Sequence, residues 1–216
     1  RRCKTISYTY TEPTIFAEYA CDVGRLAHEA GIKNVWVSNG YMTPEALGAF
    51  APCLDGINVD LKSFSAETYR KMMGAKLEGV LETLRLFRPH NIWLEVTTLV
   101  VPGVNDGDGE LRQLAEFVAS LGPEVPWHIS RFHPDYRVDD RDITPVRTLE
   151  RAADIGKRSG LKYVYAGNVP GHASEHTHCP SCGKQVIERF GFSIGRYDVE
   201  NGNCRFCHAK IDGIGL

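Results

Sequence analysis

Six short runs rich in β-branched and aromatic residues recur along the 216-residue chain, and segments with helical periodicity separate them. Strand, helix and strand in alternation predict parallel β/α units. Six or more units in series favour a barrel or partial barrel, and a doubly wound sheet is the alternative. The expected strands are Thr5–Tyr10, Asn34–Ser38, Ile57–Leu61, Ile92–Leu99, Trp127–Arg131 and Lys162–Ala166.

The segments between these strands carry helix signals. Thr43 and Thr144 each precede a proline, which predicts a capping threonine followed by proline at the first helical position. Ser65 is expected to cap another helix. The first intervening helix places its apolar residues at steps of three and four, which predicts one buried face; that face comprises Ile15, Phe16, Tyr19, Val23, Leu26, Ala27 and Ala30.

Composition excludes several classes of protein. The 25 basic and 27 acidic residues give a net charge of −2, and no Lys/Arg run exceeds two residues, so duplex nucleic acid and anionic membranes are poor candidates for partners. No stretch approaches the roughly 18 to 20 apolar residues of a membrane helix, and no secretory leader opens the chain. We therefore expect a cytoplasmic protein.

Polar residues follow each expected strand. Parallel strands present their carboxyl ends at one edge, where such folds bind ligands. The set suits a polar ligand with an amino acid part and a nucleoside part, although strand ends are also where a chain meets water. Its members are Thr11-Glu12-Pro13, Asn39-Gly40, Asp60 with Lys62, Thr97-Thr98 leading to Pro102-Gly103, His133-Pro134, and Asn168.

Two of these features have a structural alternative. The carboxylate of Glu12 and the ammonium of Lys62, which follows Asp60, form either a structural ion pair or a pair that holds the ammonium and carboxylate of a substrate. His133 serves either the site or the packing of its own loop.

The chain changes character after Gly167. We expect a β/α domain over residues 1–172 and a small metal module over residues 173–216. Cys179 and Cys182 form one Cys-x-x-Cys pair, and Cys204 and Cys207 form a second, a spacing typical of a four-cysteine zinc site.

Such a zinc site has no open coordination position and is structural, and a single iron ion is the alternative occupant. His172, His176, His178 and His208 are possible substitute ligands or neighbours, or exposed loop histidines. The remaining cysteines are Cys3, Cys21 and Cys53, of which Cys21 is expected to be a buried structural thiol.

Several ordered blocks of the chain closely resemble the radical S-adenosylmethionine (SAM) enzyme of the AmmeMemoRadiSam system, a relative of pyruvate formate-lyase activating enzymes. The resemblance covers essentially the whole chain. The blocks are Ser7–Thr14, Val37–Pro44, Asn58–Lys62, Glu95–Asp106, Trp127–Pro134 and Tyr163–Gly171.

This resemblance implies a partial β/α barrel that binds SAM and a 4Fe-4S cluster. Electron transfer would cleave SAM to a 5′-deoxyadenosyl radical that abstracts hydrogen from an unidentified substrate. By the same resemblance, Thr11 and Glu12 occupy the turn that meets the methionine ammonium, and main chain near Val101 and Pro102 approaches the adenine. The other pocket residues implied are Asn39, Asp60, Lys62 and His133.

The resemblance also implies partners of the Memo and Ammecr types. It places the cluster-binding Cys-x-x-x-Cys-x-x-Cys loop upstream of these residues, because no cysteine trio here has that spacing. Three thiolates must hold such a cluster. The 216 residues alone are therefore expected to be an inactive C-terminal portion of the enzyme.

Two other functions remain open from the sequence. A non-catalytic β/α scaffold could use the metal module as an adaptor. A metal-dependent hydrolase is disfavoured, because the strand ends lack clustered His and Asp ligands.

Overall fold

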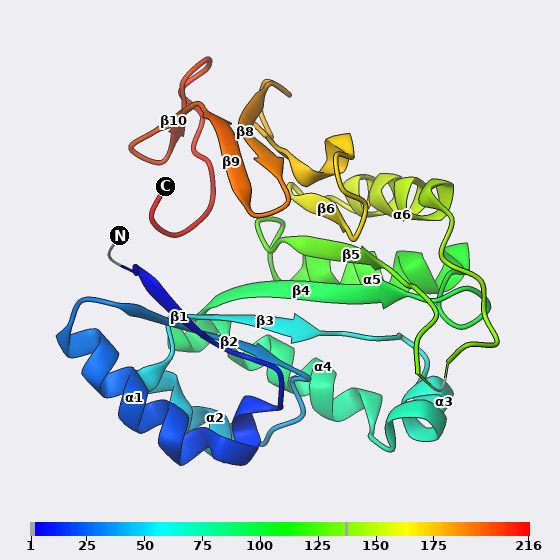
Figure 1. Cartoon of the computed structure of the whole chain (residues 1–216), viewed down its shortest axis with the longest axis horizontal. Helices are drawn as coiled ribbons and strands as arrows, with labels where there is room; N and C mark the ends of the chain where they lie inside the picture. The colour runs from blue at the N-terminus through cyan, green and yellow to red at the C-terminus, as the bar shows by residue number, and fades with distance from the viewer. Residues whose placement is uncertain (1–2, 137) are drawn as a thin grey trace. The chain divides into compact units, whose positions relative to one another are not determined.

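The computed structural model describes residues 3–136 and 138–216. A six-stranded parallel sheet forms its framework, and its strands lie in the order in which they occur along the chain (Figure 1). This sequential order excludes the doubly wound alternative, in which the strand order reverses. The strands are β1 (Thr5–Tyr8), β2 (Lys33–Ser38), β3 (Gly56–Asp60), β4 (Trp93–Val100), β5 (Trp127–Arg131) and β6 (Val164–Gly167).

Helices connect the strands, as parallel neighbours require. The α-helices are α1 (Ala17–Glu29), α2 (Pro44–Phe50), α3 (Ala66–Thr68), α4 (Leu77–Leu86), α5 (Asp108–Leu121) and α6 (Val146–Arg158). The 3-10 turns are η1 (Pro13–Phe16), η2 (Ala51–Cys53), η4 (Arg88–His90) and η5 (Ala173–Glu175), and η3 (Tyr69–Met73) is a π-helix.

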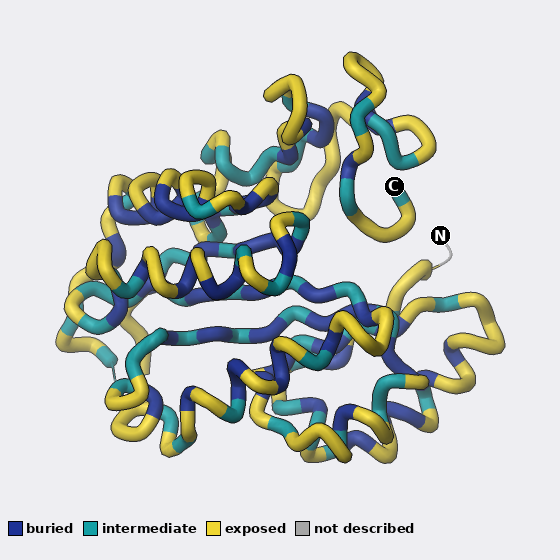
Figure 2. Tube along the Cα trace, turned by 180° about the vertical axis from the view of Figure 1, so that it is seen from behind, coloured by how far each residue is buried: buried dark blue, intermediate teal, exposed yellow. Residues whose placement is uncertain are grey.

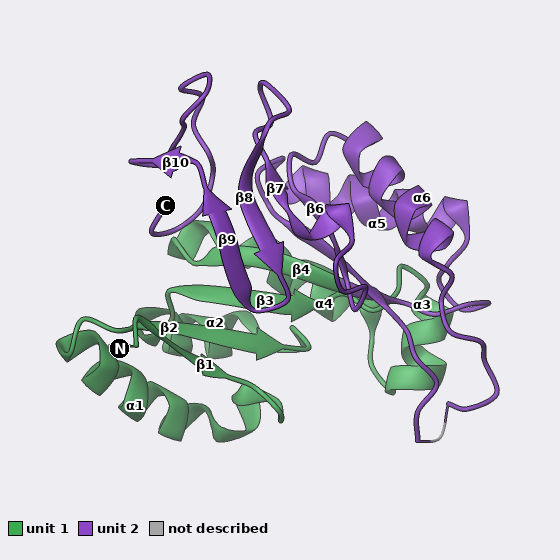
Figure 3. Cartoon of the chain, turned by 45° about the horizontal axis from the view of Figure 1, so that its top comes forward, with its two compact units in different colours: residues 1–97 green, residues 98–216 purple. Residues whose placement is uncertain are grey.

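The chain divides into two compact units, Arg1–Thr97 and Thr98–Leu216, with the boundary inside β4 (Figure 3). This boundary differs in position from the one expected near residue 172, which separates the β/α domain from the metal module. The expected functional division stays a prediction.

The first unit buries one face of its strands under helices. Along β3 and the residue after it, Ile57, Val59 and Leu61 are almost completely buried, whereas the alternating Asn58 and Asp60 are only partly buried. Successive side chains of a strand point to opposite faces. The polar residues of β3 therefore share the face opposite the apolar core, and Figure 2 shows the alternation of burial along the strands.

β1 is two residues shorter than predicted. Tyr10 has a left-handed backbone with φ of 69° and a fully exposed side chain. A left-handed residue cannot continue a strand, so the chain turns here and leads into Glu12 and η1.

The buried face of α1 differs from the predicted one. Ile15, Tyr19 and Leu26 are 75%, 68% and 65% exposed. The buried residues of α1 are small, namely Ala17, Ala20, Cys21, Gly24 and Ala27, and of these only Ala27 belongs to the predicted face.

The reason for this difference is a close approach between α1 and η2. An added Cβ at Gly24 would lie 3.2 Å from the carbonyl oxygen of Cys53. Large side chains do not fit at so short a separation, so the small-residue face packs inward. The burial predicted for Cys21 is confirmed.

The two predicted threonine caps have different outcomes. Thr43 caps α2, because its hydroxyl accepts the amide of Ala46 at 3.2 Å. Thr144 does not cap α6: its buried hydroxyl donates to the carbonyl of Val100 at 2.6 Å and accepts the amide of Phe132 at 3.2 Å. Tertiary hydrogen bonds therefore take the place of the cap.

The second unit packs α6 closely against β5 and β6. An added Cβ at Gly156 would lie 3.0 Å from the Trp127 ring and 3.0 Å from Val164. The Trp127 indole is fully buried and donates to the Thr98 hydroxyl at 3.0 Å. Glycine at this position allows the helix to cover the large ring.

The C-terminal segment has its own small core. Its strands are the antiparallel β7 (Thr177–His178), β8 (Gln185–Phe190) and β9 (Ser193–Tyr197), and the pair β10 (Val199–Glu200) and β11 (Asn203–Cys204). The buried cluster comprises only Cys179, Val186, Ile187, Val199, Cys204 and Ile211. So few residues provide little hydrophobic stabilisation.

Candidate functional site

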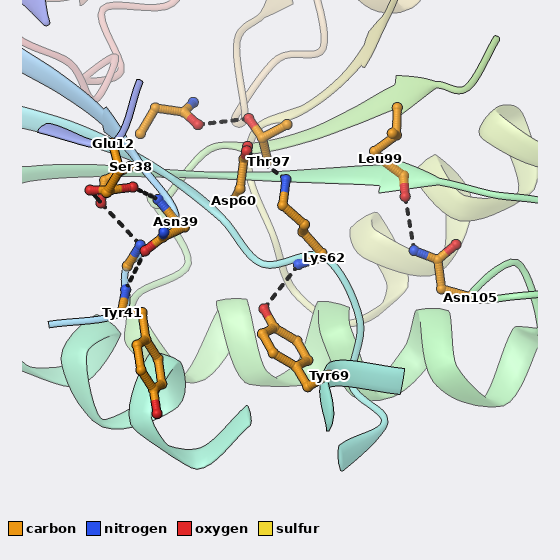
Figure 4. Close-up of polar contacts among 12 residues, drawn as sticks. Glu12, Ser38, Asn39, Tyr41, Asp60, Lys62, Tyr69, Thr97, Leu99 and Asn105 are labelled. Carbon is orange, nitrogen blue, oxygen red and sulfur yellow. Dashed lines mark hydrogen bonds and ion pairs between the residues drawn. The ribbon is translucent and has the colours of Figure 1, made fainter. Parts of the chain in front are cut away.

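Five of the predicted site residues lie in the first unit, at the carboxyl ends of β1, β2 and β3, and Thr11 is one of them. Asn39 follows β2 directly, Asp60 is the last residue of β3, and Lys62 comes two residues later. Glu12 lies in the turn after β1. We call Glu12, Asn39, Asp60 and Lys62 the strand-end site (Figure 4).

Glu12 links the ends of β1 and β2. Its Oε1 accepts the Ser38 hydroxyl at 2.7 Å and two bonds from Thr14, and its Oε2 accepts the Asn39 amide at 2.7 Å. The same carboxylate caps η1. Because a carboxylate offers about four acceptor positions, Oε2 retains capacity for a further donor.

The turn after β2 is fixed locally. The Asn39 side-chain oxygen accepts the Tyr41 amide at 2.8 Å, and the buried Ser38 hydroxyl accepts the Gly40 amide at 3.0 Å. Gly40 has φ of 70°, and an added Cβ would lie 2.6 Å from Val59. Only glycine meets both conditions, and the turn presents Asn39 at the exposed edge of the sheet.

Asp60 and Lys62 form an ion pair after β3. The Lys62 ammonium lies 2.8 Å from Oδ2 of Asp60, and both side chains are more than a third exposed. On the same strand, Asn58 accepts the Thr97 hydroxyl at 2.8 Å. An exposed pair of this kind adds little stability, so its charges remain available to a ligand.

Sequence reasoning missed Ser38 and Tyr69. Ser38 lies between the Glu12 carboxylate and Gly40, and its serine hydroxyl just before Asn39 was the available signal. Tyr69 is 3% exposed, and its hydroxyl accepts the Lys62 amide at 3.2 Å. Burial is the main cause that raises the pKa of Tyr69; the Lys62 amide lowers this pKa and the Asp60 charge raises it. No sequence pattern indicated the Tyr69 contact.

Thr11 and His133 are the predicted site residues outside the strand-end site. Thr11 is exposed in the turn before Glu12. His133 is exposed and lies in the second unit, in the loop after β5. Its role stays a prediction, as do the roles of the strand-end site.

The Val101–Pro102 segment begins a turn that Asn105 organises. The buried Asn105 side chain accepts the Val101 amide at 2.7 Å. It also donates to the Leu99 carbonyl at 2.8 Å (Figure 4). The main chain of this segment is therefore held from within its own unit.

The four predicted metal-ligand cysteines converge. Their sulfur atoms all lie within 4.8 Å of one another, with Cys179 and Cys207 3.6 Å apart and Cys182 and Cys204 3.8 Å apart. Within the described ranges, they form the one group with the geometry to hold a metal ion, and none of the four nearby histidines belongs to it.

The two cysteine pairs adopt equivalent turns. The Gly183 amide donates to the Cys179 carbonyl at 2.9 Å, and the His208 amide donates to the Cys204 carbonyl at 2.8 Å. Gly183 and His208 have φ of 71° and 61°. Each turn brings both of its sulfur atoms to a common centre.

Thiol chemistry at this centre favours a cation. Burial raises the pKa of Cys204. Hydrogen bonds from the amides of Phe206 and Cys207 and from the neighbouring thiols outweigh this effect and lower the pKa to about 7. Thiolates are the form that binds metal. Four sulfur atoms within 4.8 Å of one another fit the closed tetrahedral set that holds a structural zinc ion.

The sequence comparisons identify the family. Residues 1–117, more than half of the chain, match the family model described as the Radical SAM superfamily. The chain belongs to the radical SAM superfamily.

Several relatives and structures resemble this radical SAM chain. It is 47% identical over 213 residues to an uncharacterized protein of Methanocaldococcus jannaschii, covering 97% of this chain and 63% of the relative. It is 23% identical over 167 residues to the pyruvate formate-lyase 1-activating enzyme of Escherichia coli, covering 71% and 68%. The chain thus spans about two thirds of the length of these relatives.

Solved structures support the fold. A domain of pyruvate-formate lyase-activating enzyme from Bacteroides vulgatus has a TM-score of 0.66 at 19% identity, covering 76% of this chain and 98% of that domain. Streptococcus suis SuiB bound to S-adenosylmethionine has a TM-score of 0.61 at 10% identity, covering 76% and 39%. At these identities the likeness establishes fold alone.

The superfamily implies SAM and a 4Fe-4S cluster as cofactors, and the residues present fit them differently. Apart from the four converging cysteines, Cys3 is exposed while Cys21 and Cys53 are buried, and their spacing does not suit a cluster loop. These 216 residues do not fit the cluster. The strand-end site, with carboxylate acceptors and an ammonium donor, fits the amino and carboxylate groups of SAM.

No described helix combines the length and apolar character that crossing a lipid bilayer requires.

Proposed function

We propose that this chain contributes the SAM-binding strand ends of a cytoplasmic radical SAM enzyme of the AmmeMemoRadiSam type. SAM, when bound to a reduced cluster, supplies the radical chemistry that removes hydrogen from a substrate. The observation that carries the proposal is the strand-end site itself, a preformed set of acid, amide and amine groups in the segment that matches the superfamily.

Each residue of the set has a role in the proposal. Oε2 of Glu12 accepts a hydrogen bond from the methionine ammonium, and Asp60 adds a second negative charge at the same edge. Lys62 donates to the methionine carboxylate, and Asn39 lines the edge between them. His133 and main chain near Val101 lie in the second unit, and their proposed role toward the nucleoside part rests on the family resemblance alone.

We further propose that the cluster ligands come from a Cys-x-x-x-Cys-x-x-Cys loop outside these residues, so that the 216 residues do not react alone; the spacing of the cysteines in this sequence supports this proposal. Memo-type and Ammecr-type proteins are proposed partners. A non-catalytic scaffold is the second candidate, and the observation that favours it is the lack of a cysteine trio with cluster spacing in this sequence.

Replacing Lys62 tests the proposal. In the complete protein carrying its cluster, Lys62→Ala should raise the Kd for SAM about tenfold, because a charge-assisted hydrogen bond is worth about 1.5 to 3 kcal/mol. Equilibrium dialysis with radiolabelled SAM measures this change. Lys71→Ala is the matched control, since Lys71 pairs with Glu67 at an exposed helical position. Equal affinity of Lys62→Ala and the unchanged protein would remove Lys62 from the site.

A further inference from the structure

The segment that follows β3 folds back on itself, because Tyr69 bonds to the main chain of Lys62 near the start of the segment. Ser65 accepts the Thr68 amide at 3.2 Å through its hydroxyl and the Tyr69 amide at 3.0 Å through its carbonyl. Ser65 therefore caps the helical segment, which begins at Ala66, four residues after Lys62.

A π-helical turn then determines where Tyr69 lies. The π-helix Tyr69–Met73 ends at Gly74, which has φ of 64°, and the Ala75 amide donates to the Tyr69 carbonyl at 3.3 Å. π-Turns are rare and occur frequently at functional sites. Here the turn starts at Tyr69, and the Tyr69 hydroxyl reaches the main chain at Lys62.

The contact joins Tyr69 to the strand-end site through one hydrogen bond. The Lys62 amide donates to the Tyr69 hydroxyl, and the ammonium of that same lysine pairs with Asp60 (Figure 4). A phenylalanine would fill the same buried space, so packing alone does not require the hydroxyl. A buried tyrosine hydroxyl needs a polar partner, and the Lys62 amide is one that the structure provides.

We propose that Tyr69 is a positioning residue for SAM binding: it fixes the main chain of Lys62 and thereby aims the ammonium. This inference rests on the proposed function of Lys62. Tyr69 contacts Lys62 through the main chain and acts through it.

The first test measures the exposure of the Lys62 amine without SAM. Tyr69→Phe removes the hydroxyl acceptor, so we expect acetic anhydride to acetylate Lys62 two to three times faster, as followed by mass spectrometry of peptides. The rate at Lys71 serves as an internal reference.

Tyr8→Phe is the matched control protein. Tyr8 is also buried in the first unit, and its hydroxyl donates to Asn34 at 3.1 Å. The Tyr8→Phe variant loses one hydrogen bond at a similarly buried position that does not involve Lys62. The rate at which Lys62 is acetylated in this variant should therefore stay unchanged. An equal rise in both variants would mean general loosening and would overturn the inference.

The second test is a double-mutant cycle on SAM affinity in the complete cluster-bearing protein. Tyr69→Phe should raise the Kd for SAM three- to fivefold, yet have no further effect in the Lys62→Ala background. An equal effect in both backgrounds, or none in either, would overturn positioning through Lys62.

These results separate the two proposals. If Lys62→Ala leaves SAM affinity unchanged, the proposed role of Lys62 fails, while the acetylation rates still decide whether Tyr69 holds Lys62. If Lys62→Ala weakens binding and Tyr69→Phe changes neither affinity nor acetylation, only the inference about Tyr69 fails.

Discussion

The strand-end site and the four-cysteine group both bring polar side chains together, but they do so by different means. At the strand ends, Glu12 binds Ser38 and Asn39 directly, and the parallel sheet beneath fixes the register. In the C-terminal segment, two equivalent turns bring four sulfur atoms within 4.8 Å over a very small core. The first arrangement is held by hydrogen bonds within the protein, whereas the second has the geometry to hold a metal ion.

The two regions should depend differently on their proposed ligands. The contacts of the strand-end site form without a ligand, so the presence or absence of SAM should change the first unit little. A metal centre couples binding to folding, because the ligands come together only in the folded state. Substitutions in the two regions should therefore differ most in their effect on structure.

The largest expected effect is at the cysteines. Changing Cys179 and Cys204 to serine together should abolish binding of about one zinc ion per chain and unfold residues 173–216. Structural zinc contributes on the order of 10 kcal/mol, far more than the small core supplies. Metal analysis and limited proteolysis measure both losses. Cys3→Ser, which alters an exposed cysteine, is the control, and full metal retention in the double variant would refute the four-thiolate assignment.

An intermediate effect is expected at Glu12. Glu12→Ala removes four hydrogen bonds at a partly buried position, so the free energy of unfolding should fall by about 2 kcal/mol. Urea denaturation measures this change, and Glu18→Ala, an exposed change in the first turn of α1, provides the baseline. If Glu12→Ala matched Glu18→Ala, Glu12 would not hold the strand ends together.

The sequence predicts the parts of the fold that depend on local chemistry. Thr43 caps its helix because its partner amide lies three residues away, and the cysteine turns follow from their spacing. Thr144 carries the same local signal, but its hydroxyl bonds to Val100, 44 residues away in the sequence. No local pattern contains that partner.

The same limit applies to α1 and to Tyr69. Hydrophobic periodicity selected Ile15, Tyr19 and Leu26, but the close approach at Gly24 buries the small residues instead. The contact between Tyr69 and Lys62 depends on the π-helical turn that starts at Tyr69. No sequence motif predicts such a turn. The buried face of α1 and the contact of Tyr69 both depend on how closely segments of the chain approach one another in the folded structure.

The smallest expected effect distinguishes the two cysteine turns. His208 has the left-handed backbone that glycine adopts in the equivalent position of the first turn, and a side chain there costs roughly 1 kcal/mol. Greater freedom of glycine in the unfolded chain offsets part of the gain. His208→Gly should therefore stabilise the folded metal-bound state by about 0.5 kcal/mol, which lowers the metal Kd about twofold.

Competition with a chelator measures this twofold change. His208→Ala is the matched variant, because it removes the imidazole but keeps a Cβ at the strained position, and its metal Kd should stay within a factor of two of that of the unchanged protein. If both variants weakened metal binding more than fivefold, the imidazole itself would contribute to the metal centre. The metal centre would then depend on His208 as well as on the four sulfur atoms, and the two turns would be equivalent only in their backbone conformation.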